Sequence, residues 1–187
     1  PVTEQMIDMS WPEDVVLQYL LTGGDRLSRH PRNGLPFKLV NNYGPTESSV
    51  VSTSGIVEPG QVGAPNIGKV IDNLKIYVLD DSLSLVPVGR KGELCVGGVG
   101  LARGYLNRPE ETGKVFIPNP FSDDPKERIY RTGDLVRFCE DGSLEFVGRK
   151  DFQVKIRGFR IELGEIESVL MQFDPVVNAI VLVKKDR

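Results

Sequence analysis

Short apolar segments separated by turn residues run through most of the sequence from about Val62 onward. They include LKIYVLDD, GELCVGG, LVRFCEDGSLEFVGR and FQVKIRG, and Asp, Gly and Asn occupy the turns between them. Segments of this length and composition are typical of antiparallel strands. In CEDGSLEF, Asp141 and Gly142 supply the turn of a β-hairpin. The pattern predicts an antiparallel β region, either a small β-barrel-like subdomain or a distorted sheet.

Two apolar runs earlier in the chain each lead into a polar turn that contains glycine. Residues 15–22, VVLQYLLT, are followed by GGD, and residues 36–41, PFKLVN, lead into NNYGPTESS. Strands that end in such turns are typical of the ligand-binding edge of an α/β sheet. We therefore expect an α/β sheet edge, followed by the antiparallel region.

The period of the apolar residues changes again near the C-terminus. The spacing of an amphipathic helix is shown by Ile166, Val169, Leu170 and Phe173. Asp174-Pro175 ends this helix, and residues 176–185 have the composition of a strand. One helix and one strand are too little for a complete layer. We expect this part of the chain to be the beginning of a second, truncated domain.

Composition and charge argue against several classes of protein. The net charge is −3, with 23 basic and 26 acidic residues, so nucleic-acid binding is not expected. No apolar run approaches the roughly 18 residues of a membrane helix, and no signal peptide opens the chain. Cys95 and Cys139 fit reduced core thiols of a cytoplasmic protein. The single histidine, His30, lies in a polar turn and is expected to have a surface role.

The stretch NNYGPTESS, residues 41–49, combines side chains that could bind a nucleotide. Thr46 can donate to a phosphate oxygen, and Glu47 offers the hard oxygen ligand that Mg²⁺ prefers. Tyr43 offers a ring for a purine, and Asn41 or Asn42 offers a donor and an acceptor for a base edge. The alternative is a polar turn in which Thr46 caps the following helix.

Three further stretches carry glycine or charge. In YRTGDL, Asp134 could accept from two ribose hydroxyls, although TGD could equally be a tight turn. FVGRKDFQVKIRGFRIELGEIE is dense in charge, which suits a solvated hairpin or a mobile junction that faces an anionic ligand. GGVGLARGYLNRP matches neither the Walker A loop nor the Rossmann fingerprint. Its glycines are expected to serve a turn or close backbone packing.

Taken in order, three of these stretches closely resemble the adenylate-forming (AMP-binding) superfamily, and more narrowly an adenylation domain of a nonribosomal peptide synthetase. They are NNYGPTESS, GELCVGGVGLARGYLNRPEET and RIYRTGDLVRFCEDGSLEFVGRKDFQVKIRGFRIELGEIE. The resemblance runs from about Tyr19 to the C-terminus. The segment from Gly148 to Glu167 is the most specific part, because acyl-CoA synthetases usually carry looser versions of it.

The resemblance implies an ATP-dependent amino-acid adenylating ligase. Such enzymes form an aminoacyl adenylate and pass the aminoacyl group to a phosphopantetheine thiol on a carrier domain. It implies that Thr46 contacts the α-phosphate and that Glu47 holds Mg²⁺, as the catalytic residues. Tyr43 would stack on adenine.

The remaining nucleotide contacts are implied by the same motifs. Asn41 and the Gly24-Asp25 backbone would lie near the adenine edge. Asp134 would accept from the ribose hydroxyls, with help from Arg149. Asp151 matches the family's hinge, so residues 1–150 would be the C-terminal portion of the large AMP-binding core domain and residues 151–187 the hinge and the start of the small one. That small domain moves between the two half-reactions.

The resemblance also places part of the amino-acid pocket in this chain. The implied lining residues are Leu21, Gly23, Asn42, Val50 and Val51. Most of this wall is apolar, and Gly23 leaves room beside it, so we expect leucine or a similar aliphatic substrate. Partners implied by the family are the amino acid, a peptidyl carrier domain and neighbouring synthetase domains.

Some motifs of the family are not found in this sequence. The phosphate-binding loop and the aspartate for the substrate amino group would lie upstream, and the lysine that bridges phosphate and carboxylate would lie downstream. Lys184 and Lys185 do not match that lysine's motif. We expect the chain by itself to be inactive. The alternatives left open are a fragment of an acyl-CoA synthetase-like ligase and an inactive nucleotide-binding or scaffold piece.

Overall fold

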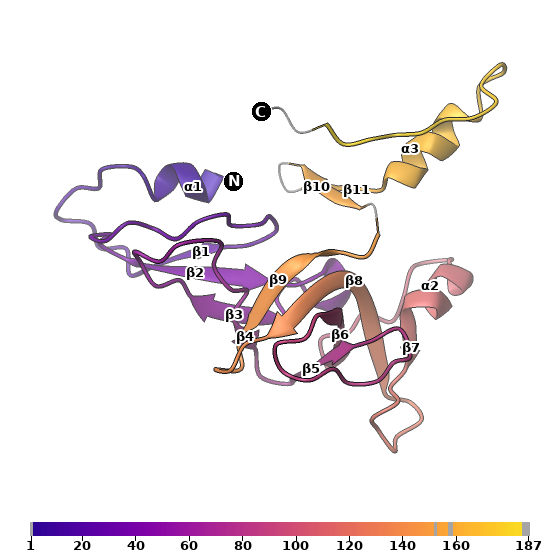
Figure 1. Ribbon diagram of the computed structural model, residues 1–187, viewed down its shortest axis with the longest axis horizontal. Coiled ribbons are helices and arrows are strands. Elements are labelled where there is room, and N and C mark those ends of the chain that lie inside the picture. The colour runs from indigo at the N-terminus through magenta and orange to yellow at the C-terminus, as the bar shows by residue number, and fades with distance from the viewer. Residues whose placement is uncertain (1, 152, 157–158, 185–187) are drawn as a thin grey trace. The chain divides into compact units, whose positions relative to one another are not determined.

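A computed structural model describes residues 2–151, 153–156 and 159–184 (Figure 1). The chain forms two compact units, which meet in the sequence between Lys150 and Asp151. Each unit is described by itself. No helix in the described ranges combines the length and the apolar character that crossing a bilayer would require.

The first sheet of the first unit has the order β1-β2-β3-β4. It follows α1 (Val2–Met6), and its strands are β1 (Tyr19–Thr22), β2 (Lys38–Tyr43), β3 (Thr53–Ile56) and β4 (Lys69–Val70). β1 and β2 are parallel, which confirms the predicted α/β sheet edge, and the other pairs are antiparallel. The predicted first strand is shorter than expected, because pairing with β2 begins only at Tyr19.

The second sheet is antiparallel and is built around the long strand β8. Its strands are β5 (Leu74–Leu79), β6 (Gly92–Gly98), β7 (Phe116–Pro118), β8 (Arg128–Phe138) and β9 (Leu144–Arg149), and α2 (Pro109–Val115) precedes β7. β6 pairs along one edge of β8, and β7 and β9 share the other edge. The predicted hairpin between β8 and β9 is confirmed, and Gly142 adopts a positive φ of 79° in its turn.

The β-barrel-like interpretation of this region is wrong, and the distorted sheet is what the chain forms. The outer edge of β5 is taken by the chain that returns beside it. Leu79 forms a bridge with Leu85, and the Val86 N–H donates to the Val78 carbonyl at 3.0 Å. This segment stands where a closing strand would have to pair. Irregular register at Leu135/Val136 in the β8–β9 ladder adds to the distortion without closing the sheet.

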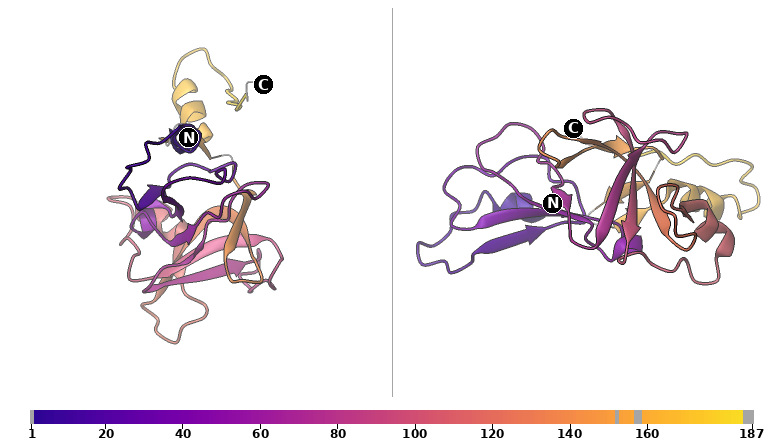
Figure 2. Two further views of the ribbon diagram at one scale, coloured as in Figure 1. Left: turned by 90° about the vertical axis from the view of Figure 1, so that its left-hand side faces the viewer. Right: turned by 90° about the horizontal axis from the view of Figure 1, so that it is seen from below.

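Apolar packing and a short backbone ladder join the two sheets of the first unit, which can be followed from other sides in Figure 2. Ile67, from the segment before β4, is buried against residues of β5, β6, β8 and β9. Its N–H donates to the Leu144 carbonyl at 2.8 Å, and the Leu144 N–H donates to the Gly68 carbonyl at 2.9 Å. Tyr43, the last residue of β2, packs against the same cluster. The end of β2 is thereby fixed beside the second sheet.

The second unit contains a hairpin and a helix. β10 (Val154–Ile156) pairs antiparallel with β11 (Phe159–Ile161), and α3 (Leu163–Leu170) follows. The predicted amphipathic helix is present but ends earlier than expected. The predicted strand at residues 176–185 is wrong over 176–184, which form no strand, and Lys185 lies outside the described residues. No neighbouring strand in the described part of this unit pairs with it, and the Val181 N–H donates to the Glu167 side chain at 2.9 Å.

The two thiols differ in accessibility, and this difference predicts their reactivity. Cys95 on β6 is 0% exposed, and burial, with the nearby Glu93 charge, raises the pKa of its thiol to about 12. Cys139 is only partly buried. Because the thiolate is the reactive form, iodoacetamide at pH 8 should label Cys139 in the native protein and Cys95 only after denaturant is added. Peptide mapping by mass spectrometry measures this order, and equal native labelling would contradict it.

Candidate functional site

The side chains of Tyr43, Asp134 and Arg149 meet in one buried cluster. The Tyr43 hydroxyl donates to Oδ2 of Asp134, and Nη1 of Arg149 donates to Oδ1 at 2.5 Å. Asp134 is 6% exposed. Tyr43 ends β2, Asp134 lies inside β8, and Arg149 is the residue opposite Asp134 on β9. The sheet register therefore brings together three residues that sequence reasoning had placed in one nucleotide site.

The backbone around Asp134 is part of a strand, so the alternative of a simple tight turn is wrong. Thr132 Oγ1 accepts from the Asp134 N–H at 3.0 Å and donates to the Leu94 carbonyl at 2.8 Å. Arg149 Nη2 also donates to the Thr132 carbonyl at 3.2 Å. Gly133 has a positive φ of 71°, which is unfavourable for residues with a side chain. These contacts fix the direction in which the Asp134 carboxylate points.

Electrostatics keep the Tyr43 phenol protonated. Burial raises the pKa of Tyr43 well above its usual value, and the Asp134 carboxylate raises it further. The neutral phenol can therefore donate to Asp134 throughout the physiological range. Above about pH 10, where an unfolded tyrosine ionises, the folded state loses this contribution to its stability.

Thr46 and Glu47 lie in a single turn, η1 (Thr46–Ser48). The capping alternative for Thr46 is wrong, because Pro45 occupies the N-cap position and no side-chain capping bond is made. Thr46 is exposed, whereas Glu47 is 6% exposed. The Tyr105 hydroxyl donates to Oε1 of Glu47 at 2.6 Å. An exposed hydroxyl and a held carboxylate are therefore presented side by side.

The residues that follow this turn adopt an unusual backbone conformation. Ser49 and Val50 have positive φ angles of 53° and 74°. For a β-branched residue such as Val50 this is a strained conformation, of the kind found at ligand-binding sites. Gly44 permits the close approach, because a Cβ there would lie 2.6 Å from the Val50 carbonyl oxygen.

The other candidate adenine contacts lie near the same end of β1 and β2. Asn41 is buried, and its Nδ2 donates to the Asn66 carbonyl at 2.9 Å. Gly24 has a positive φ of 79°, and Oδ1 of Asp25 accepts from the Arg26 N–H at 2.8 Å. The Arg26 guanidinium lies 5.7 Å from the centre of the Phe146 ring. This stacking brings the loop after β1 to the second sheet, and the contacts of Asn41, Gly24 and Asp25 with adenine stay predictions.

The proposed amino-acid pocket residues fall in two groups. Leu20 packs on the core, so Leu21 points to the opposite face of β1. Asn42 lies on that same face, and a Cβ on Gly23 would be 2.8 Å from the Asn42 carbonyl oxygen. Val50 and Val51 lie in the strained loop. Leu21 and Val50 are 64% and 68% exposed, so these residues form an open wall within the described part of the chain.

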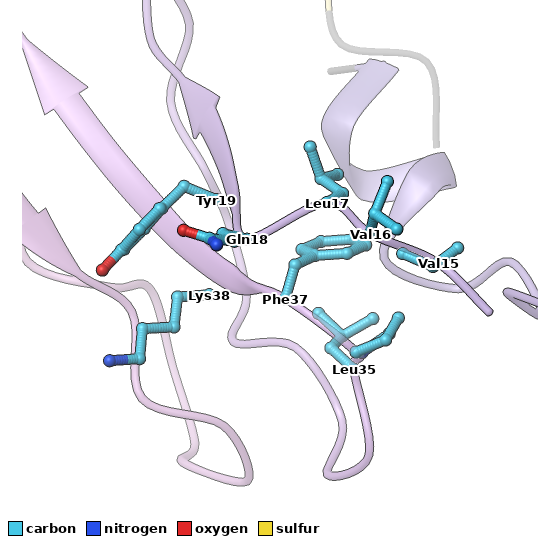
Figure 3. A pocket seen from close by; sticks show the side chains of 9 residues that line it. Val15, Val16, Leu17, Gln18, Tyr19, Leu35, Phe37 and Lys38 are labelled. Carbon is cyan, nitrogen blue, oxygen red and sulfur yellow. The ribbon is translucent and has the colours of Figure 1, made fainter. Parts of the chain in front are cut away.

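A cavity of about 520 Å³ lies elsewhere, at the amino ends of β1 and β2 (Figure 3). Its lining comes from residues 15–19 and 35–38. The candidate nucleotide and substrate residues lie at the opposite, carboxyl ends of these parallel strands, which is where α/β sheets usually bind ligands. The cavity contains none of the predicted site residues.

The predicted hinge residue, Asp151, is the first residue of the second unit. It is exposed, and its Oδ1 accepts from the Gln153 N–H at 3.1 Å. Arg157, from the charge-dense stretch, lies outside the described residues. The division of the chain at this residue makes a hinge here physically reasonable, and its movement stays a prediction.

Sequence reasoning missed several residues that support the site. Tyr105 binds Glu47, Thr132 fixes the Asp134 backbone, and Arg26 stacks on Phe146. Tyr105 could have been noticed as the aromatic residue of the glycine-rich stretch GGVGLARGYLNRP. Thr132 and Arg26 carry no comparable signal, because ordinary surface strands contain many threonines and arginines.

Among the described residues, no group of three or more His, Cys, Asp or Glu side chains is arranged to hold a metal ion. Glu47 nevertheless suits Mg²⁺, which usually binds proteins through one or two carboxylates and takes its other ligands from water and substrate phosphates.

Comparison with known proteins identifies relatives of the whole chain. The description of the AMP-binding enzyme family matches residues 9–106. A protein of the linear gramicidin synthase of Brevibacillus parabrevis is 53% identical over 189 residues, which is 100% of this chain and 4% of that protein. Surfactin synthase subunit 2 from Bacillus subtilis is 49% identical over 186 residues, 100% of this chain and 5% of that protein. The chain thus spans a small fraction of these relatives.

Solved structures give the same result for the fold. An NRPS protein containing adenylation and PCP domains is 34% identical, with a TM-score of 0.76 over 90% of this chain and 36% of that one. An artificially fused adenylation–PCP di-domain from Klebsiella oxytoca is 27% identical, with a TM-score of 0.76 over 91% and 33%. With its two sheets and its site residues in family order, the chain belongs to the AMP-binding enzyme family and corresponds to the C-terminal part of a nonribosomal peptide synthetase adenylation domain.

Proposed function

We propose that the chain is part of an enzyme that activates an amino acid with ATP and passes it to a carrier-protein thiol. In the first step an amino-acid carboxylate oxygen attacks the α-phosphorus of ATP. A new O–P bond forms, the bond to the β-phosphate breaks, and pyrophosphate leaves. In the second step the phosphopantetheine thiolate attacks the acyl carbon, a thioester forms, and AMP leaves.

The observation that carries this proposal is the cluster of Tyr43, Asp134 and Arg149. Each oxygen of the Asp134 carboxylate accepts one bond from the protein. A carboxylate has about four lone-pair sites, so Asp134 can also accept from two neighbouring ribose hydroxyls. Arg149 and the neutral Tyr43 keep the carboxylate ionised and oriented, and the Tyr43 ring offers a surface for adenine.

The turn that contains Thr46 and Glu47 would serve the phosphates. The exposed Thr46 hydroxyl can donate to an α-phosphate oxygen. The Glu47 carboxylate would hold Mg²⁺ together with the phosphates, and the cation supplies charge neutralisation for the transferred group. Glu47 accepts from Tyr105 and, as a carboxylate, retains the capacity to ligate a cation.

The test of the function is ATP–pyrophosphate exchange by the full-length protein that contains this chain. We expect labelled pyrophosphate to enter ATP only when an amino acid and Mg²⁺ are present. Exchange that depends on a fatty or aryl acid, with thioester formation on free CoA, would favour the acyl-CoA ligase. Nucleotide binding without any exchange would favour the scaffold. The chain alone, without further domain segments, should give no exchange.

We further propose leucine, or an aliphatic amino acid of similar size, as the substrate. The wall formed by Leu21, Asn42, Val50 and Val51 carries no charged side chain. A charged substrate side chain would be desolvated there without a partner, at a cost of several kcal/mol. Gly23 contributes space, but a side chain at this position would first meet the β2 backbone at Asn42, so enlarging it would disturb the sheet as well as the pocket.

A panel of amino acids in the exchange assay measures this preference. Leucine should give the highest kcat/KM, and valine and isoleucine should be about 10- to 200-fold weaker, since one methylene is worth about 1–3 kcal/mol in an apolar pocket. Aspartate and lysine should be inactive. A preference for either charged amino acid, or for tryptophan, would contradict the proposed pocket.

A peptidyl carrier domain and neighbouring synthetase domains are the proposed partners. The similar solved structures contain adenylation and PCP domains, which supports this proposal. A cytoplasmic location is proposed from the free thiols of Cys95 and Cys139 and from the need for ATP.

A further inference from the structure

Tyr105 makes a direct contact with the candidate metal ligand that no part of the proposed function uses. Its hydroxyl donates to Oε1 of Glu47 at 2.6 Å, although the two residues are 58 positions apart. Hydrogen bonds to a carboxylate are short and strong compared with neutral ones. A bond of this kind limits the orientations that the Glu47 side chain can adopt.

The segment from Gly100 to Tyr105 grips the turn of Glu47 through its backbone as well. The Ala102 N–H donates to the Glu47 carbonyl at 2.8 Å, and Oγ of Ser49 donates to the Gly100 carbonyl at 2.8 Å. Together with the Tyr105 bond, these contacts hold the turn at its carboxylate, at its backbone and just after it. The glycine-rich stretch thus forms a clamp, defined here as residues 100–105, on the Glu47 turn.

Tyr105 is itself fixed before any ligand binds. Its N–H donates to Thr112 Oγ1 at 2.9 Å, and its ring packs edge-on against Phe116 at 5.8 Å. Gly104 allows this close packing, because a Cβ there would lie 2.5 Å from a Thr112 methyl carbon. A phenol held on both sides can position its acceptor at little entropic cost.

The clamp backbone is also held by β8. Arg128 donates from Nη2 to the Ala102 carbonyl at 3.2 Å and from Nη1 to the Arg103 carbonyl at 3.1 Å. The Arg128 guanidinium also lies 5.3 Å from the Phe116 ring centre. One side chain therefore connects the clamp with the ring on which Tyr105 packs.

We propose that Tyr105 is a positioning residue that orients the Glu47 carboxylate for the divalent cation bound with ATP. This inference rests on the proposed function and adds to it a residue outside the nucleotide motifs. Groups that orient a metal ligand typically change metal affinity by about 10- to 100-fold when they are removed. Tyr105 acts on the cation only through Glu47.

The variant Tyr105→Phe tests the proposal in the full-length protein, because it removes only the hydroxyl and keeps the ring on Phe116. Mn²⁺, which also prefers oxygen ligands, replaces Mg²⁺ as the probe. Its affinity is measured by electron paramagnetic resonance in the presence of α,β-methylene ATP, which cannot form the adenylate. We expect about 10- to 100-fold weaker Mn²⁺ binding and an unchanged KM for the amino acid.

The matched control is Tyr77→Phe. Tyr77 lies on β5, accepts a hydrogen bond from Asn119 at 3.1 Å and stacks on Phe121, so this variant also loses one tyrosine hydroxyl contact. It should bind Mn²⁺ as the wild type does. If both variants lower Mn²⁺ affinity equally, the effect is general to tyrosine hydroxyls and the positioning role is overturned.

A double-mutant cycle with Glu47→Gln separates positioning from a wider structural role. If Tyr105 acts through Glu47, Tyr105→Phe should have little further effect on Mn²⁺ affinity in the Glu47→Gln protein. An undiminished effect there, or wild-type Mn²⁺ binding by Tyr105→Phe alone, overturns the inference and leaves the proposed function standing. Absence of nucleotide-dependent Mn²⁺ binding in the wild type would overturn both.

Discussion

Replacing Glu47 by glutamine should lower the rate of ATP–pyrophosphate exchange by about 100-fold or more, because a metal ligand is lost and the cation's several kcal/mol of charge stabilisation are weakened. The amide keeps the size of the side chain and an oxygen that can still accept from Tyr105. The exchange rate is measured over a range of Mg²⁺ concentrations. We expect the Mg²⁺ concentration at half-maximal rate to rise while the KM for the amino acid changes little.

A second buried glutamate provides the control for this prediction. Glu93 on β6 is as buried as Glu47, and its Oε2 accepts from Arg131 at 2.6 Å, away from the candidate site. Glu93→Gln should lower the melting temperature, since it breaks a buried ion pair, but should leave the Mg²⁺ dependence of exchange unchanged. If Glu47→Gln retained the wild-type Mg²⁺ dependence, Glu47 would have no role as a metal ligand.

The alternation and turn residues of the sequence were sufficient to predict the antiparallel sheet and the hairpin at Asp141-Gly142, because both depend on local chemistry. They could not predict that Ser84–Val86 would return along β5 and keep the sheet open. That arrangement depends on the Asp80 turn, in which Oδ1 accepts from the Ser82 and Ser84 N–H groups at 2.9 Å each. A barrel and an open sheet share the same local pattern.

The predicted strand at residues 176–185 failed for a related reason. Its β-branched composition favours an extended chain, but a strand forms only where a neighbour offers hydrogen bonds. In the described part of the second unit the only paired strands are β10 and β11. Composition reports the preference of a segment and says nothing of its partner.

The candidate site was predictable in its residue types and not in its bonds. Tyr43 and Asp134 carry recognisable chemistry, yet they are 91 positions apart and meet only because the end of β2 packs beside β8. Arg149 meets Asp134 because the β8–β9 register places them opposite each other. Tyr105 reaches Glu47 through a loop whose path no local signal reveals. Chemistry is written locally in this sequence, and geometry depends on pairing between distant strands.

The structure changes what should be expected when Asp134 is replaced. Removal of this carboxylate takes away two ribose contacts, and it also leaves the Arg149 charge in a buried position without its ion-pair partner. The first effect should weaken ATP binding at least about tenfold, since hydrogen bonds to charged groups are worth about 1.5–3 kcal/mol. The second should destabilise the fold by about 3–5 kcal/mol. A simple loss of activity in Asp134→Ala would therefore not identify the cause.

Asp134→Asn and deoxynucleotides separate the two effects. The asparagine keeps the volume and one acceptor, and the KM is measured for ATP, 2′-deoxy-ATP and 3′-deoxy-ATP. If Asp134 binds the ribose, the wild type should prefer ATP over both deoxynucleotides, and most of this preference should disappear in the variant. The control Glu145→Gln removes an exposed ion pair with Arg137 from the same β8–β9 ladder, which is worth about 1 kcal/mol or less. It should keep the full preference for ATP. A variant Asp134→Asn that melts earlier but still prefers ATP as strongly as the wild type would show that Asp134 supports the fold and does not bind the ribose.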